Sequence, residues 1–292
     1  MRNLFACGVI AVAGLSAAAC GGNDNTTDDV PVIDAPVVAV DAKAIDAAPD
    51  SPTIDAAEET YNFTCETNAA PTTIPASVSV SGVTQSLALS GQAVLPSVAL
   101  ELHNAADAPI GSTTSDATTG TYLLTTDTGG QAFNGSLYAT KTGYRRTVIF
   151  PPTPVSTNLT NLPTILITPD NFTFLNNLAA GMQDDTANGF VLVAMVDCAG
   201  ARIGGATLHV KKAGVEVGTQ YPLSMLDPNA GKGVIAVFNV PPGDIELSGA
   251  YFAHTLFTHT VRSYKNTQAD PQNTGAFATL TQTVLTPGYP NP

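Results

Sequence analysis

The sequence contains no tryptophan, and aromatic residues occupy only 7% of its 292 positions. Charged residues are also few, at 12%, and basic ones are the scarcest: 11 lysines and arginines face 24 aspartates and glutamates, a formal charge of −13. Proteins that bind nucleic acid need clustered basic residues to neutralise phosphates. We therefore predict that this chain has no nucleic-acid partner.

Sequence motifs for catalysis and metal binding are missing as well. There is no Gly-x-Ser-x-Gly elbow, no His-Glu-x-x-His, no Cys-x-x-Cys, no phosphate-binding loop with Gly-Lys-Ser/Thr and no Asp-rich calcium loop. The sequence therefore lacks the common signatures of hydrolases, zinc proteins, redox enzymes and nucleotide-binding proteins. We predict no catalytic residue, no metal site and no cofactor, and we do not expect an enzyme.

The four histidines do not form a ligand set in the sequence pattern. His103 and His209 alternate with apolar neighbours, which places both on the solvent face of a strand. His254 and His259 are five positions apart, so one continuous strand would direct them to opposite faces. His259 is in phase with Phe257 and Val261, and we expect its side chain to be half-buried and hydrogen-bonded.

Long hydrophobic runs are limited to the N-terminus, where an apolar stretch from Leu4 to Leu15 follows a short basic start. Ser16-Ala17-Ala18-Ala19-Cys20 comes next, so residues 1–19 have the three parts of a secretory signal peptide. The stretch is shorter than the roughly 20 residues that a membrane-spanning helix needs.

The small residues directly before Cys20 resemble the lipobox of bacterial lipoproteins, in which the cysteine becomes the acylated N-terminus. This resemblance implies diacylglycerol on Cys20, usually a further acyl chain such as palmitate on its amine, and a cell-envelope location. Gly21 in place of aspartate favours the outer membrane, at its periplasmic face or the cell surface. Ala17-x-Ala19 also suits an ordinary signal peptidase, which would leave a secreted protein with an unmodified Cys20.

Residues 20–60 form an acidic, Asp/Ala/Pro-rich segment. From Gly21 to Thr60 there is no leucine and no aromatic residue, and ten acidic residues face Lys43 alone. Such a composition buries too little apolar area to offset ordering entropy, and its charge and prolines keep it extended. We predict a disordered tether, which serves either as a spacer above the membrane or as a linker with no required sequence.

The remainder predicts an all-β protein with two tandem β-sandwiches. Short alternating apolar runs separated by turn residues fill residues 61–169 and again residues 189–292, a spacing that favours sandwiches over βαβ units. Residues 170–188 break the pattern. Asp170 or Asn171 could cap a short helix there, with Phe174, Leu175 and Leu178 on one face, and we interpret this segment as a connector.

Both sets of strands resemble carboxypeptidase regulatory-like domains, which are transthyretin-like sandwiches. The second set carries Val-Asp-x-x-Gly-x-x-Ile-x-Gly-Ala-x-Leu over Val196 to Leu208, and later Phe238 to Ile245 reads Phe-Asn-Val-Pro-Pro-Gly-Asp-Ile. The first set matches through the turn from Asp116 to Leu124 and through Ala139 to Tyr144, with a degenerate opening element. The resemblance implies the fold of these domains, because the matching motifs mark its turns. The motifs contain no catalytic or ligand-binding residues.

Cysteines are few, and their positions are informative. Four occur: Cys7 would leave with the signal peptide and Cys20 would be acylated, which leaves Cys65 and Cys198. An even pair in an exported chain suggests a disulfide between Cys65 and Cys198, although two separate buried thiols are the alternative.

These features together predict a lipid-anchored cell-envelope protein with a non-catalytic binding or structural role. Its partners would be the membrane, through the lipid anchor, and an envelope protein or polysaccharide. One alternative is a carbohydrate-binding module of starch-binding-like fold, although such modules usually bind through tryptophan. Another is an accessory subunit of an envelope enzyme on a different chain.

Overall fold

A computed structural model describes residues 60–88, 91–179, 181, 187–225, 228, 231–265 and 279–289. The predicted signal peptide, Cys20 and all but the last residue of the predicted tether lie outside these residues, so those interpretations stay predictions. Among the helices that the structure describes, none is both long and apolar enough to cross a membrane.

The described chain is all-β, as the sequence predicts, with a single α-helix in the described ranges. The strands before the helix are β1 (Ser77–Ala88), β2 (Gly91–Val94), β3 (Ala99–Asn104), β4 (Pro109–Thr114), β5 (Thr121–Asp127), β6 (Gly135–Thr140), β7 (Thr147–Phe150) and β8 (Thr164–Ile167). The helix is α1 (Pro169–Leu178). The elements after it are β9 (Gly189–Met195), β10 (Thr207–Lys212), β11 (Val215–Glu216), β12 (Thr219–Pro222), the 3-10 turn η1 (Leu223–Met225), β13 (Val234–Val240), β14 (Gly243–Tyr251), β15 (His254–Ser263) and β16 (Leu280–Leu285).

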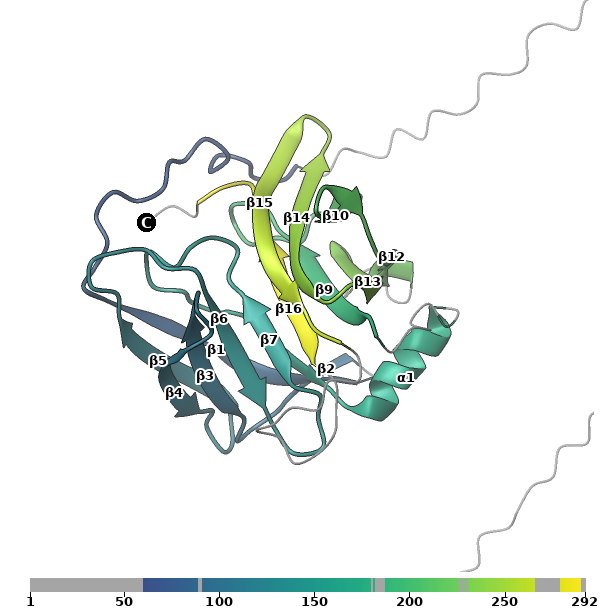
Figure 1. The fold of residues 1–292 in the computed structure, drawn as a ribbon, viewed down its shortest axis with the longest axis horizontal. Coiled ribbons are helices and arrows are strands. Elements are labelled where there is room, and N and C mark those ends of the chain that lie inside the picture. Colours follow the sequence, from purple (N-terminus) through teal and green to yellow (C-terminus); the bar gives the residue numbers. More distant parts are fainter. Residues whose placement is uncertain are drawn as a thin grey trace, which may run out of the picture. The chain divides into compact units, whose positions relative to one another are not determined.

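These strands form two sandwiches that share one sheet (Figure 1). The shared sheet has the order β12-β13-β9-β16-β7-β6-β3-β4. A first outer sheet contains β2, β1 and β5, with β8 parallel to β1, and a second outer sheet has the order β11-β10-β14-β15. The sandwiches are joined because β16, the last strand, lies parallel to both β7 and β9.

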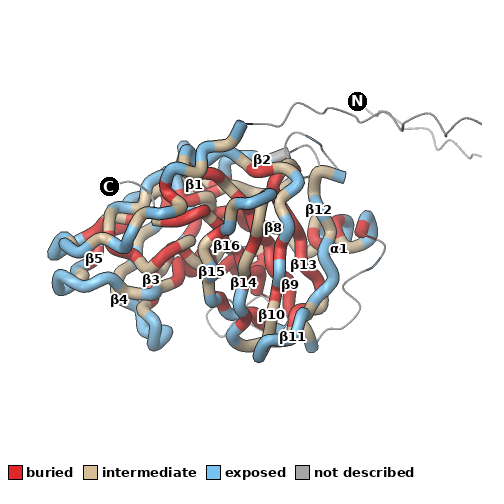
Figure 2. The backbone as a smooth tube through the Cα atoms, turned by 90° about the horizontal axis from the view of Figure 1, so that it is seen from above, coloured by how far each residue is buried: buried red, intermediate tan, exposed pale blue. Residues whose placement is uncertain are grey.

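The two outer sheets cover opposite faces of the shared sheet. Ile149 of β7 and Leu192 of β9 are both aligned with Gln282 of β16, so they lie on one face. Ile149 belongs to the first core, and Leu192 packs in the cluster beneath α1. Val193 lies on the other face, in the second core under β10, β14 and β15. Strand β9 is therefore buried along its whole length, which explains its continuous apolar sequence (Figure 2).

Strand β16 is buried although three of its central residues are polar. The Gln282 side chain accepts a hydrogen bond from the Ile165 amide at 3.2 Å and donates one to the Pro163 carbonyl at 2.9 Å. Thr281 donates to the Arg262 carbonyl at 2.7 Å, and Thr283 donates to the Phe150 carbonyl at 2.9 Å. These buried polar groups are satisfied, and they bind the strand to backbone of both sandwiches.

The helix is present where the sequence places it, but its cap and its buried face differ from the prediction. Thr168 is the N-cap and accepts a hydrogen bond from the Asn171 amide at 3.2 Å. Phe172 and Leu175 are buried, whereas Phe174 is 40% exposed and Leu178 is 44% exposed. The helix directs Phe172 toward Phe190 of the shared sheet, with ring centroids 5.1 Å apart. This contact determines which face of the helix is buried.

Candidate functional site: a polar groove beside the shared sheet

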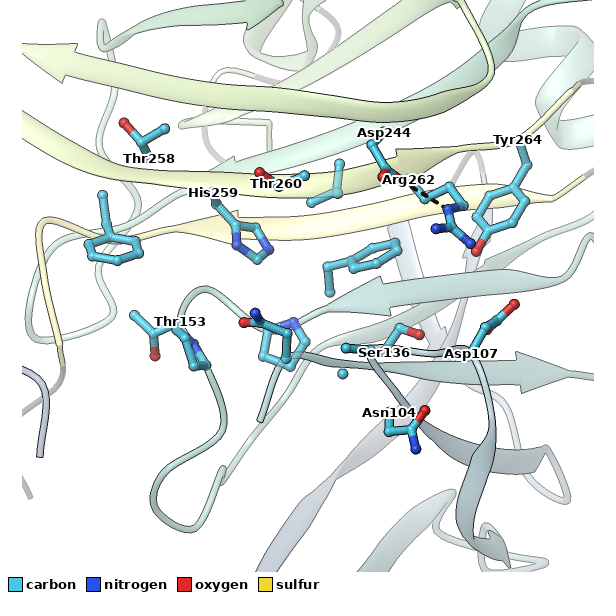
Figure 3. A pocket seen from close by; sticks show the side chains of 18 residues that line it. Asn104, Asp107, Ser136, Thr153, Asp244, Thr258, His259, Thr260, Arg262 and Tyr264 are labelled. Carbon is cyan, nitrogen blue, oxygen red and sulfur yellow. Dashed lines mark hydrogen bonds and ion pairs between the residues drawn. The ribbon is translucent and has the colours of Figure 1, made fainter. Parts of the chain in front are cut away.

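A groove with a volume of about 420 Å³ lies between β15 and the uncovered part of the shared sheet. One wall comes from the turn after β3, the start of β6 and the segment after β7, and the other comes from β14 and β15 (Figure 3). Alternation explains the first wall: Leu137 and Ala139 of β6 enter the first core, so Ser136, which lines the groove, and Tyr138, which lies behind it, face the opposite side. The groove has the size of an ordinary small-molecule site.

Hydroxyl, amide and aromatic side chains dominate the lining. Two carboxylates and one guanidinium are present, from Asp107, Asp244 and Arg262. The other lining side chains with polar or aromatic groups are Asn104, Asn134, Ser136, Phe150, Thr153, Phe257, Thr258, His259, Thr260 and Tyr264. The lining thus offers many neutral hydrogen-bonding groups and several ring surfaces.

A buried hydrogen-bond network supports the floor of the groove. The Tyr138 hydroxyl donates to Asp107 Oδ1 at 2.6 Å and lies 3.0 Å from the Tyr264 hydroxyl. Because Tyr138 has one hydroxyl proton and gives it to Asp107, Tyr264 is the donor in the second bond. Burial, together with these hydrogen bonds, raises the pKa of Tyr138 far above its usual range, so the hydroxyl stays protonated. The network therefore fixes both Asp107 and Tyr264 from behind.

His103 belongs to the same network, and its predicted solvent exposure is wrong. It is 7% exposed, and its ring stacks on Tyr138 with centroids 4.0 Å apart. Its Nδ1 lies 3.2 Å from Asp107 Oδ1, and its Nε2 lies 3.2 Å from Glu101 Oε2. The side of β3 that alternation assigns to solvent is covered here by Tyr138 and by the turn that carries Asp107.

Arg262 and Asp244 form an ion pair across neighbouring strands in the groove. The two residues are aligned in the β14–β15 ladder, and Arg262 Nε donates to Asp244 Oδ1 at 3.0 Å. The hydrogen bond to Asp244 raises the pKa of Arg262, so its positive charge is retained. The guanidinium is thus already engaged with a carboxylate.

His259 is aimed into the groove from β15, toward the side that carries Thr153 and Ser136 (Figure 3). Its half-burial is as predicted, and burial lowers its pKa to about 4, so the ring is neutral near pH 7. The expected hydrogen bond is not confirmed: Nε2 is buried and has no hydrogen-bond partner within the described ranges. His254 has different neighbours altogether, so the structure does not bring these two histidines together.

The predicted disulfide between Cys65 and Cys198 is confirmed, with the two Cα atoms 5.7 Å apart. It fastens a strap, residues 61–68, to the second sandwich. The Cys198 amide donates to the Asn62 carbonyl at 2.8 Å, and the Asn62 amide donates to Asp197 Oδ2 at 2.8 Å. Cys65 is 1% exposed, so the bridge is shielded from solvent.

The strap also holds the tip of the β14–β15 hairpin. Glu66 Oε2 lies 2.8 Å from His254 Nδ1, and Glu66 Oε1 accepts from the Thr255 amide at 2.7 Å. The hydrogen bonds from His254 and Thr255 lower the pKa of Glu66. The Phe63 ring stacks on the His254 ring with centroids 3.9 Å apart. His209, by contrast, is exposed as predicted and pairs with Glu216 at 2.9 Å.

No known family model matches the chain, and none of the curated proteins compared with it matches. Among solved structures, it is similar to the Bacillus anthracis TIE protein, with 11% identity, a TM-score of 0.23 and coverage of 71% of this chain and 33% of that one. It is also similar to a streptococcal ancillary pilin, with 12% identity, a TM-score of 0.23 and coverage of 72% and 62%. For the shaft pilin SpaA from Lactobacillus rhamnosus GG, the identity is 9%, the TM-score 0.23 and the coverage 74% and 100%. The chain thus spans about a third of the first of these proteins and less than two thirds of the second.

Proposed function

We propose that this chain is a lipid-anchored protein of the bacterial cell envelope with a non-catalytic binding or structural role. Cys20 would carry the anchor to the outer membrane, and two sandwiches that resemble carboxypeptidase regulatory-like domains would carry the role. The observation that supports this best is the buried Cys65–Cys198 bridge. Disulfides persist in oxidising compartments outside the cytoplasm, which agrees with the export signal and lipobox in the sequence.

A non-catalytic role is supported by the engagement of both described cysteines and of three of the four histidines. The two described cysteines are joined to each other. His103 lies between Glu101 and Asp107, His209 pairs with Glu216, and His254 pairs with Glu66 and stacks on Phe63. These contacts hold parts of the fold together, and each occupies a side chain that could otherwise serve as nucleophile or base.

Binding is favoured over a purely structural role by the groove. It combines neutral polar groups, aromatic rings and one unsatisfied imidazole nitrogen on a floor that the Tyr138 network fixes in place. Clefts of about this size are the usual places where proteins bind small molecules.

The anchor is tested by substituting Cys20→Ser, with Cys7→Ser as the matched control. The wild-type protein is expected in the membrane fraction, with mass spectrometry placing diacylglycerol on Cys20. The Cys20→Ser variant should leave that fraction or keep its signal peptide. Cys7→Ser should behave like the wild type, because residue 7 lies within the predicted signal peptide. A mature wild-type N-terminus with a free amine and an unmodified Cys20 thiol would contradict the proposal.

A further inference from the structure

We propose that the groove binds a neutral carbohydrate, and that His259 Nε2 hydrogen-bonds a hydroxyl of that ligand. This inference rests on the proposed binding role and adds the chemical class of the ligand. It starts from His259 itself: a buried polar nitrogen without a partner in the described part of the chain is rare in native proteins and needs an explanation. Its position on the groove wall makes a bound ligand the natural partner.

A hydroxyl group suits His259 whichever ring nitrogen carries the proton. A neutral imidazole has one donor nitrogen and one acceptor nitrogen, and a hydroxyl can accept from the first or donate to the second. Burial lowers the pKa of His259 to about 4, so the imidazolium, which would only donate, is not the form present near neutral pH. A polyhydroxylated ligand therefore satisfies this nitrogen without a change of charge.

The charges in the groove favour a neutral ligand. An anion would meet the carboxylates of Asp107 and Asp244, and the only guanidinium among the lining residues is already paired with Asp244. A cation would compete with existing partners as well, since Asp107 accepts from Tyr138 and lies beside His103, while Asp244 accepts from Arg262. Both kinds of charge are thus occupied within the protein.

The neutral lining matches the two surfaces of a sugar ring. Sugars have hydroxyl edges, which hydrogen-bond side chains such as Asn104, Ser136 and Thr153, and apolar C–H faces, which pack against aromatic rings. Phe150, Phe257 and Tyr264 supply rings along the same groove. The volume of about 420 Å³, open to solvent on one side, accommodates part of an oligosaccharide chain whose remainder extends outward.

The test is a titration of the purified full-length protein, in a detergent without a sugar headgroup, with a panel of neutral oligosaccharides. The panel is maltohexaose, cellohexaose, mannohexaose and chitohexaose, and hexagalacturonate and spermine are the charged comparisons. Calorimetry should give a dissociation constant of about 10⁻³ to 10⁻⁵ M for at least one neutral member. NMR signals of the His259 ring should shift on binding of that member.

The variants separate a direct contact from a general loss of fold. His259→Ala should weaken binding about tenfold or more, which corresponds to the loss of one hydrogen bond to a buried group. His259→Gln, which keeps a donor and an acceptor, should retain more affinity. His209→Ala is the matched control, because His209 is exposed on β10 and is not part of the groove lining.

Three results would overturn the inference: no neutral member of the panel binds, hexagalacturonate or spermine binds instead, or His259→Ala binds as tightly as the wild type. None of these results bears on acylation, which is read from the mass of the mature N-terminus. The experiments therefore distinguish a refuted carbohydrate proposal from a refuted lipid-anchor proposal.

Discussion

The two histidines that alternate with apolar residues on strands show how far side-chain alternation predicts environment. His209 and His103 both lie opposite core-facing neighbours, yet His209 is exposed and His103 is buried. The difference arises because Tyr138, from the neighbouring strand β6, stacks on the His103 ring, and the turn directly after β3 folds back and places Asp107 beside it. Local pattern gives the face of a strand, but what covers that face is decided by tertiary structure.

His259 makes the stability of the protein depend on pH in a specific window. Its folded-state pKa is about 4, below the unfolded value of 6.5. Between these values the unfolded chain binds a proton that the folded chain does not, so stability falls as the pH is lowered from 6.5 toward 4. At about 1.4 kcal/mol per pKa unit the loss would reach roughly 3 kcal/mol for a fully buried ring, and we expect about 1–3 kcal/mol for this half-buried one.

Urea unfolding of the wild type and of His259→Gln at pH 7.5 and pH 4.5 measures this effect. The wild type should lose more stability than the variant on acidification, because glutamine does not titrate. Asp107, Asp244 and Arg262 line the same groove and are common to both proteins, so their contribution cancels in the difference. Equal losses in His259→Gln and the wild type would refute the assignment.

At the scale of elements, most strands could be located from the sequence, but some faces could not. In β15 the register against β14 shifts between Leu247 and Gly249, where Leu247 pairs with His259 and Gly249 with Leu256. One extra residue on β15 thus lets Leu256 and Val261 both enter the second core although five positions separate them. A bulge of this kind leaves no clear mark in an alternating sequence. If the alternation is followed through the bulge, the residues beyond it are therefore assigned to the wrong face of the strand.

The buried face of α1 gives a direct test of the corrected helix orientation. Leu175→Ala should lower the free energy of unfolding by about 2–4 kcal/mol, because Leu175 is 6% exposed and packs in the cluster beneath the helix. Leu178→Ala is the matched control, and since Leu178 is 44% exposed its cost should stay below about 1 kcal/mol. Denaturant unfolding measures both, and a larger loss for Leu178→Ala would restore the orientation that the sequence suggested.

At the scale of the whole molecule, the sequence predicts two sandwiches but does not reveal that they share a sheet. The link is β16, which pairs in parallel with strands from both halves and lies far along the chain from β7. Its central residues Thr281, Gln282 and Thr283 are polar, and the structure buries them between two ladders. Pairing between segments so distant in sequence has no local signal.

This shared sheet, together with the disulfide, makes a prediction about unfolding. The Cys65→Ser/Cys198→Ser double variant should melt at a lower temperature than the wild type, with a loss of up to about 5 kcal/mol by the chain-entropy model for a loop of this length. Both proteins should nevertheless unfold in one calorimetric transition, because β16 couples the two cores. Wild-type protein with reductant present throughout the scan is the control for the substitutions, and two separate transitions in either protein would show that the cores unfold independently.

The strap also determines how mechanical tension would travel through the protein. A pull on the segment before residue 60 reaches Cys65 and passes through the covalent bridge to Cys198. Strands β1 to β8 lie in the chain between these cysteines, so the first sandwich is bypassed by that tension. The chain near Tyr289 lies beside the same strap: the Asn68 side chain donates to the Tyr289 carbonyl at 3.0 Å, and a Cβ on Gly288 would come within 2.1 Å of the Cys65 carbonyl oxygen. Both ends of the described chain therefore lie at the bridge. Tension applied between these two ends would not pass through the first sandwich.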